Sequence, residues 1–158
     1  MATPLDEDTG RLFLHLKAAQ GAARNALDDA LSDMGISSQQ LLILRAVELS
    51  PAISGAQLAR ECFVSPQTMA TTIAKLEAAG LIVRSKGEGR VIETHLTDKG
   101  RAIFDRAGSR VQSAERYIAE VLGAGTVAEL DRILRDFTDC LQKSLVVTTS
   151  RTWDTEGD

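Results

Sequence analysis

The chain has 158 residues, of which 44% are hydrophobic, 25% charged and 4% aromatic, with a formal net charge of −4. This composition is typical of a soluble globular protein with one core, and no apolar run approaches the ~18 residues that a membrane span needs. The N-terminus MATPLDEDTG is acidic and polar, unlike a signal peptide, and the two cysteines are isolated. We therefore expect a cytoplasmic protein without a disulfide framework, a structural zinc site or a membrane partner.

The acidic total is unevenly distributed along the chain. Residues 1–36 carry three basic and six acidic residues, and residues 100–158 carry eight basic and ten acidic ones. Residues 37–99 carry seven basic and six acidic residues. The middle of the chain is thus the only cationic part, and an anionic partner is expected there.

Two helices are predicted at the start of the chain. Apolar residues recur at steps of three and four from Leu12 to Met34, which indicates one long amphipathic helix ended by Gly35. This Ala-rich helix exceeds what the core needs, so we expect part of it to contact another subunit. A second helix, capped by Ser37 or Ser38 and stopped by Pro51, is apolar on nearly all sides and belongs at the centre of the core.

The next segment has the pattern of a helix-turn-helix. Ser54 with Gln57 has the spacing of a capping box, and the short turn Cys62–Val64 separates this helix from the next. There Ser65 is the expected N-cap and Pro66 occupies the first helical position. Two short helices joined by so brief a turn are typical of this motif.

The second helix of the motif leads into a β-hairpin. Met69, Ile73 and Leu76 fall on one face, and Gly80 ends the helix. The β-branched runs at 81–85 and 91–96 are separated by KGEG, which predicts a hairpin, the wing of a winged helix.

Two further helices close the chain. Thr97 is the expected cap of the first, whose apolar residues recur at helical spacing from Ile103 to Val121. Thr126 with Glu129 predicts a capping box at the start of the last helix, with its stripe ending near Leu141. The tail from about Val146 is polar and is expected to lie outside the fold.

Three stretches of this sequence, GISSQQLLILRAV, SGAQLARECFVSPQTMATTIAKLEAAGLIVR and GRVIETHLTDKGRAIF, carry a family resemblance. Over about residues 10 to 145 the chain resembles the multiple-antibiotic-resistance regulator (MarR) family. Specific motifs are LxxxGLIxR at Leu76–Arg84, an acid and an Arg two residues apart in the wing, and LT-x-KG at Leu96–Gly100. The wing acid is usually Asp, whereas this chain has Glu88.

The resemblance implies a fold and a function. Members are homodimers whose first and last helices intertwine, and most are transcriptional repressors released by small phenolic or lipophilic ligands. We therefore expect a mainly α fold with a small β-hairpin wing. In this fold residues 37–99 form the DNA-binding winged helix-turn-helix, 1–36 and 100–145 the dimerisation helices, and 146–158 a polar tail.

The recognition helix is the strongest candidate for reading double-stranded DNA. Gln can bond to adenine and a Thr methyl can pack on thymine, so Gln67, Thr68, Thr71 and Thr72 are expected at base edges, with Lys75 at a phosphate. The alternative is a solvated polar face. No Arg lies on this helix, which predicts moderate specificity with a share from A·T-rich DNA shape.

The wing and the helix starts supply the other expected contacts. Arg90 at the wing tip is expected in a narrow minor groove, and Arg84 and Lys86 at phosphates. Helix N-termini can also hold phosphates, which adds the starts at Ser37, Ser38, Ser54, Ser65 and Pro66. With so few cations per subunit, affinity should come from a homodimer on two half-sites of an inverted repeat.

An effector pocket is implied by the resemblance alone, between the dimerisation helices and the winged domain. Arg11, His15 and Arg45 are the candidates for an anionic aromatic or lipophilic effector. The plainer interpretations are that Arg45 buttresses the core through a carbonyl or acid partner and that His15 is an ordinary surface or interface residue.

The remaining chemistry is sparse. His15 and His95 have no carboxylate or Cys at ligand spacing, and no Gly-rich phosphate loop follows a strand, so neither an enzyme nor a metal or cofactor site is expected. Cys62 and Cys140 are expected to be packed small hydrophobes. Two alternative functions stay open: a winged-helix protein-interaction module without DNA binding, and a thiol-based oxidant sensor acting through Cys62.

Overall fold

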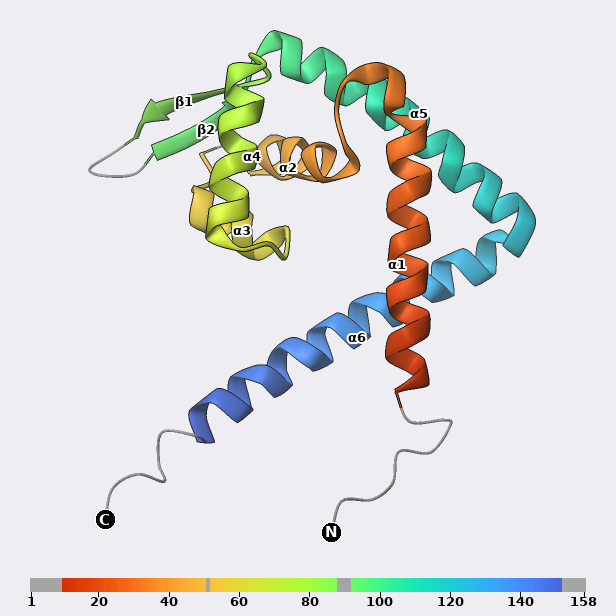
Figure 1. Cartoon of the computed structure of the whole chain (residues 1–158). Coiled ribbons are helices and arrows are strands. Elements are labelled where there is room, and N and C mark those ends of the chain that lie inside the picture. The colour runs from red at the N-terminus through yellow and green to blue at the C-terminus, as the bar shows by residue number, and fades with distance from the viewer. Residues whose placement is uncertain (1–9, 51, 88–91, 152–158) are drawn as a thin grey trace, which may run out of the picture. The chain divides into compact units, whose positions relative to one another are not determined.

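The chain folds into helices and one small sheet, in the order α1, η1, α2, α3, α4, β1, β2, α5, α6 (Figure 1). The structure is a computed structural model that describes residues 10–50, 52–87 and 92–151, and the side chains of these as far as Lys143. Arg90 and Glu88 of the expected wing tip lie outside the described residues. The chain divides into two units, Met1–Ala114 and Glu115–Asp158.

Helix α1 (Arg11–Ala30) is shorter than the periodicity predicts. The chain then makes a 3-10 turn, η1 (Ser32–Met34), before Gly35 reverses it with a φ of 69°. The apolar spacing continues through this turn because Leu31 and Met34 still face the core, with Leu31 fully buried. Gly35 therefore ends the segment as predicted, but the α-helix itself ends five residues before it.

Helix α2 (Ser38–Leu49) lies at the centre of the core, as its sequence predicts. Ser37 is the N-cap and forms a full capping box with Gln40. Ile43, Leu44 and Val47 are almost completely buried, although Leu42 on the opposite side remains 48% exposed. The helix is therefore apolar on most sides, but in the single chain Leu42 stays outside the core.

The helix-turn-helix consists of α3 (Gly55–Glu61) and α4 (Pro66–Ala78), and the wing of β1 (Ile82–Lys86) and β2 (Ile92–Leu96). The two strands are antiparallel, with Ile82 opposite Leu96 and Lys86 opposite Ile92. The boundaries agree with the predicted runs to within one residue. In Figure 1 this hairpin extends beside α4, and β1 contacts that helix.

One core holds the first unit together. Its fully buried large apolar side chains include Leu31, which precedes η1, and residues of α2, α3, α4 and β1: Ile43, Leu44, Leu58, Met69, Leu76 and Ile82. Helix α5 (Asp98–Leu122) completes the core with the buried Ala107 and with Ile103, Phe104 and Val111. Thr97 caps α5 as predicted, since its Oγ1 accepts the Gly100 N–H at 3.0 Å.

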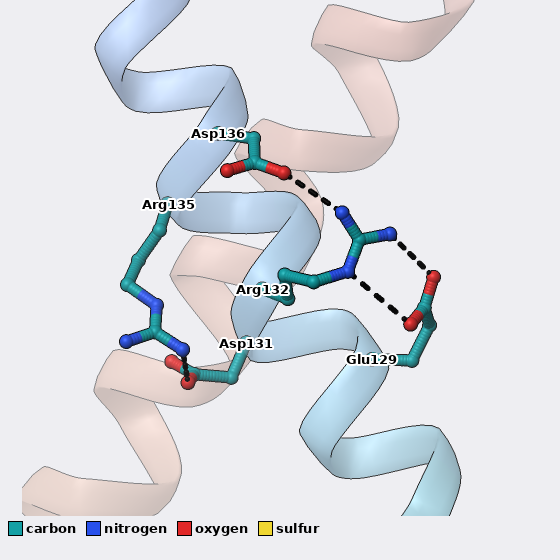
Figure 2. A network of polar contacts seen from close by, with 5 residues as sticks. All are labelled: Glu129, Asp131, Arg132, Arg135 and Asp136. Atoms are coloured by element: carbon teal, nitrogen blue, oxygen red, sulfur yellow. Dashed lines mark hydrogen bonds and ion pairs between the residues drawn. The ribbon is translucent and has the colours of Figure 1, made fainter.

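The last helix differs from its predicted bounds at both ends. Helix α6 runs from Ala124 to Arg151, so Thr126 lies inside it and the predicted Thr126–Glu129 capping box is wrong. Gly123, with a φ of 87°, makes the break between α5 and α6. Figure 2 shows the Glu129 carboxylate paired with Arg132, which also pairs with Asp136.

Candidate nucleic-acid interface

The recognition helix α4 is fixed by its buried side. Ser65 Oγ accepts the Thr68 N–H at 3.1 Å, and Pro66 occupies the first turn, where its missing N–H costs no hydrogen bond. Met69, Ile73 and Leu76 are at most 3% exposed. The predicted start and buried face are therefore confirmed, and the orientation of the opposite face follows from them.

The outward face of α4 is polar and uncharged over its first two turns. Gln67, Thr68 and Thr71 are exposed, Thr72 is half-buried, and Lys75 follows one turn later. The hydroxyl of Thr71 donates to the carbonyl oxygen of Gln67 at 3.0 Å, and that of Thr72 to Thr68 at 2.9 Å. Because each hydroxyl is turned back to its own helix, the methyl group is left as the outward-facing part of Thr71.

The wing adds positive charge beside this helix. Residues two apart share a face of a strand, so Arg84 and Lys86 lie on the same face of β1 as the buried Ile82. Both are exposed. Arg84 also borders a small hollow of about 210 Å³ whose other walls come from α3 and α4: Gly55, Ala56, Pro66, Met69, Ala70 and Ile73.

The helix N-termini differ in how accessible their serines are to a phosphate. Ser54 forms a capping box with Gln57, as Ser37 does with Gln40, and both serines are half-buried. Ser38 is 5% exposed, and its N–H donates to the Asp28 carboxylate at 2.6 Å. Because its N–H is already paired and its side chain is buried, Ser38 is not available to a phosphate in the single chain.

A second hollow, of about 380 Å³, lies beside Arg45. Its walls come from α2, the end of α3 and the turn that follows: Leu42, Arg45, Ala46, Leu49, Ser50, Glu61, Cys62 and Phe63. We call it the Arg45 hollow. Arg45 is exposed rather than buttressing the core, whereas Arg11 and His15 are exposed on α1 and do not line the hollow. The structure thus does not bring the three predicted effector residues together.

Phe63 is a feature of this hollow that the sequence did not reveal. It lies in the turn of the helix-turn-helix with a φ of 53° and is 70% exposed. A bulky residue in the left-handed region of backbone conformation is strained, and a Phe side chain that stays exposed contributes little hydrophobic free energy to offset that strain. The turn length alone gave no signal of this conformation.

The two cysteines differ from one another. Cys62 is half-buried against the core, and burial, followed by the nearby Glu61 carboxylate, raises the pKa of its thiol. Cys140 is exposed on α6, so the prediction that it packs into the last helix is wrong. The charged form of Cys62, which reacts with oxidants, is therefore disfavoured.

Within the described ranges, no cluster of three or more His, Cys, Asp or Glu side chains is arranged to hold a metal ion. None of the helices in the part of the chain that the structure covers is long and apolar enough to cross a membrane.

Comparison with known proteins places this architecture in a family. The sequence model of the MarR family matches residues 34–90. The HTH-type transcriptional repressor Rv2887 of Mycobacterium tuberculosis is 37% identical over 113 residues, which cover 70% of this chain and 81% of that protein. The homoprotocatechuate degradative operon repressor of Escherichia coli is 27% identical over 150 residues, 93% of this chain and 96% of its own length.

Solved structures agree. The M. tuberculosis MarR family protein Rv2887 in complex with salicylic acid has a TM-score of 0.65 and 34% identity, covering 84% of this chain and 97% of that one. The complex of the same protein with DNA has a TM-score of 0.63 and 32% identity, covering 84% and 98%. The matched relatives are repressors, and their likeness spans both the winged helix-turn-helix and the flanking helices. The chain belongs to the MarR family, whose members are DNA-binding transcription factors and not enzymes.

Proposed function

We propose that this protein is a homodimeric, sequence-specific DNA-binding repressor that acts in the cytoplasm and is released from its operator by a small aromatic or lipophilic ligand. The observation that carries the proposal is the exposed polar face of α4 next to the basic strand β1, in a chain 37% identical to a repressor. That likeness also favours repression over the alternative of a protein-interaction module.

The proposed DNA contacts follow from the two exposed surfaces. Gln67, Thr68, Thr71 and Thr72 read base edges in the major groove, and Lys75, Arg84 and Lys86 meet phosphates. Contacts from the helix starts at Ser37, Ser54, Ser65 and Pro66, and from Arg90 in the minor groove, complete the proposal. The whole set is repeated in the partner, so an operator with two half-sites is required.

The test measures binding to the DNA upstream of the protein's own gene. Each phosphate contact makes the slope of log K against log salt steeper by about 0.9. We expect the Arg84→Ala, Lys86→Ala double variant to bind at least about tenfold more weakly and with a shallower slope. Arg135→Ala, which removes the same kind of charge from α6, should bind as the parent does. A parent protein without salt-dependent binding to this DNA would refute the repressor function.

The Arg45 hollow is the proposed effector site. A guanidinium suits a carboxylate, and the side chains of Leu42, Leu49 and Phe63 give apolar walls for a ring. Two similar structures hold such compounds: Rv2887 with salicylic acid and NadR with 4-hydroxyphenylacetate, the latter at 25% identity and a TM-score of 0.73. Glu61, at the same hollow, can accept a hydrogen bond from the hydroxyl of a phenol.

Salicylate serves as the probe for this site. It should raise the melting temperature of the parent protein and release it from its operator, whereas Arg45→Met should lose both effects and still bind DNA. An Arg135→Met variant controls for the loss of one guanidinium. Release of the Arg45→Met variant at the same salicylate concentration as the parent would place the effector elsewhere.

A further inference from the structure

The end of the recognition helix is held by the beginning of α5. Three successive carbonyl oxygens that follow α4 accept hydrogen bonds from the segment around Thr97. Lys99 Nζ donates to Ala79 O at 2.8 Å, Thr97 Oγ1 to Gly80 O at 2.7 Å, and Thr97 N to Leu81 O at 3.1 Å. These carbonyls lie beyond the last residue of α4 and have no partner within the helix, so the bonds from the segment around Thr97 supply their hydrogen-bond donors.

The two segments also touch without space for a side chain. Gly100 is buried, and a Cβ placed on it would overlap the carbonyl oxygen of Leu81 and lie 2.9 Å from the carbonyl carbon. Leu81 is 3% exposed, so its backbone cannot move outward without opening the core. We call Ala79–Leu81 and Thr97–Gly100 together the α4–α5 junction.

The junction is also the base of the wing. The Thr97 N–H bond to Leu81 O continues the strand pairing that begins at Ile82 and Leu96. Ile82 and Thr94, one on each strand, are at most 2% exposed and fix the hairpin to the core. Helix α4 therefore ends, and the wing begins, at the same few residues.

Helix α5 is fixed on the other side of the junction. Arg101 pairs with Glu48 of α2, and Arg110 pairs with Asp33 at 2.9 Å, so α5 is tied to the helices that precede the motif. Ala107 lies in the core. The helix then continues without interruption to Leu122, past the residues that belong to the first unit.

We propose that Thr97 and Lys99 are positioning residues for DNA binding: their bonds to Gly80 and Ala79 set the orientation of the recognition helix relative to α5, and so fix the distance between the two recognition helices of the dimer. The inference rests on the proposed DNA-binding function. The three buried apolar side chains of α4 determine which face of the helix points outward. The polar contacts at its C-terminal end add a constraint on the direction of its axis relative to α5. A dimer so constrained accepts one half-site spacing and rejects others.

The experiment compares operators that differ only in spacing. The parent homodimer is measured on a duplex with two half-sites at the selected spacing, on duplexes with one base pair added or removed, and on a single half-site. The variants are Thr97→Val and Lys99→Met, with Thr97→Ser as the conservative rescue. Ser113→Ala is the matched control, because the hydroxyl of the exposed Ser113 donates to Ser109 O within its own helix, α5.

The parent should prefer its selected spacing by about tenfold or more, since one base pair rotates a half-site by about a tenth of a turn. Thr97→Val and Lys99→Met should lower this preference to about threefold or less while their affinity for the single half-site stays within about twofold. Thr97→Ser and Ser113→Ala should keep the preference of the parent.

Two results would overturn the inference while leaving the DNA-binding function in place. One is an unchanged spacing preference in both Thr97→Val and Lys99→Met. The other is a loss of affinity that is equal on all duplexes, including the single half-site, and parallels a fall in melting temperature, which indicates a purely structural role. If the parent binds none of the duplexes, the proposed function fails and this inference fails with it.

Discussion

The carboxylate of Asp28, in the last turn of α1, accepts the backbone N–H of Ser38 at 2.6 Å. The bond joins two helices that the chain separates by a 3-10 turn, and it occupies a donor at the start of α2 that has no partner within its own helix. The hydrogen bond from Ser38 is also the main reason that the pKa of Asp28 is lowered from its ordinary value of 3.8.

Replacing Asp28 should therefore lower stability in a pH-dependent way. Asp28→Ala should lose about 1 kcal/mol of unfolding free energy at pH 7, as other helix caps do. Because the folded pKa is depressed, the contribution is complete above the ordinary value of 3.8 and is lost as the pH falls through the folded pKa. Urea denaturation at one protein concentration, at pH 7 and pH 3, measures the difference.

The matched control for this change is Asp29→Ala, an exposed acid of the same turn. An acid at a helix C-terminus faces the negative end of the helix dipole, so its removal should be neutral or slightly stabilising. Equal losses for Asp28→Ala and Asp29→Ala would show that the bond to Ser38 contributes nothing.

A second stability prediction concerns two glycines of α5. Gly100→Ala places a Cβ on the Leu81 carbonyl and should cost about 3 kcal/mol, at the upper end of overpacking. Gly108→Ala meets no atom within 4 Å and should gain about 0.5–1 kcal/mol from the higher helix propensity of Ala. Thermal unfolding of both variants checks the sign, and a Gly100→Ala variant as stable as the parent would contradict the close contact.

The helix caps and the α4–α5 junction show which features the sequence predicted and which it did not. The caps at Ser54 and Ser65 and the buried face of α4 were predicted correctly, and the cap at Ser37 was one of two candidates, because cap and side-chain spacing are local signals. The LT-x-KG motif was noticed only as a family resemblance. Its function as a junction depends on contacts 17 and 20 residues apart along the chain, which no local pattern encodes.

The errors have the same origin. The Thr126–Glu129 spacing fits a cap, but Arg132 competes for Glu129 and Gly123 already ends α5. The Arg45 hollow gathers side chains from α2, α3 and a strained turn, so Arg45 was its only member that the sequence suggested as an effector-binding residue. The base-reading and phosphate-binding residues stay predictions, since their exposure shows access and not contact.

Two substitutions on α4 separate base reading from phosphate binding. Gln67→Ala should cost about 1–3 kcal/mol on the preferred operator and relax specificity at one base pair per half-site. Lys75→Ala should weaken binding to all sequences alike and reduce the salt slope by about 0.9 per subunit. Binding to a set of operators with single base-pair changes, at two salt concentrations, measures both. Identical profiles for the two variants would contradict the division of roles.

Cys62 should not act as an oxidant switch. Burial and Glu61 raise the pKa of its thiol, so at pH 7 less of it is thiolate than in a free cysteine. Iodoacetamide should modify Cys62 more slowly than free cysteine, and Glu61→Gln should increase the rate only in part because burial remains. Peroxide should leave operator binding of the parent and of Cys62→Ser equal. Peroxide release of the parent but not of Cys62→Ser would establish the oxidant sensor instead.

Helix α6 offers a test of the dimer with an internal control. Four apolar side chains of α6 are between 37% and 47% exposed in the single chain: Leu130, Ile133, Leu134 and Leu141. An exposed apolar group of this size is typical of a protein–protein interface. Figure 2 shows charged side chains of the same helix, with Arg132 paired with Glu129 and Asp136, and Arg135 paired with Asp131. The N–O distances are 2.7 Å, 2.9 Å and 2.7 Å. These ion pairs are exposed, and pairs of this kind contribute at most about 1 kcal/mol.

Leu134→Glu should therefore weaken dimerisation, whereas Arg132→Gln should not. In a two-fold symmetric dimer the change occurs twice, and burying a Leu side chain is worth about 1.5–3 kcal/mol, so the dissociation constant should rise at least about 100-fold. Sedimentation over a concentration series measures it, and Arg132→Gln should stay within severalfold of the parent. Because two half-sites are needed for tight binding, Leu134→Glu should lose operator affinity together with dimerisation. A Leu134→Glu protein that stays dimeric would place the subunit interface away from this face of α6.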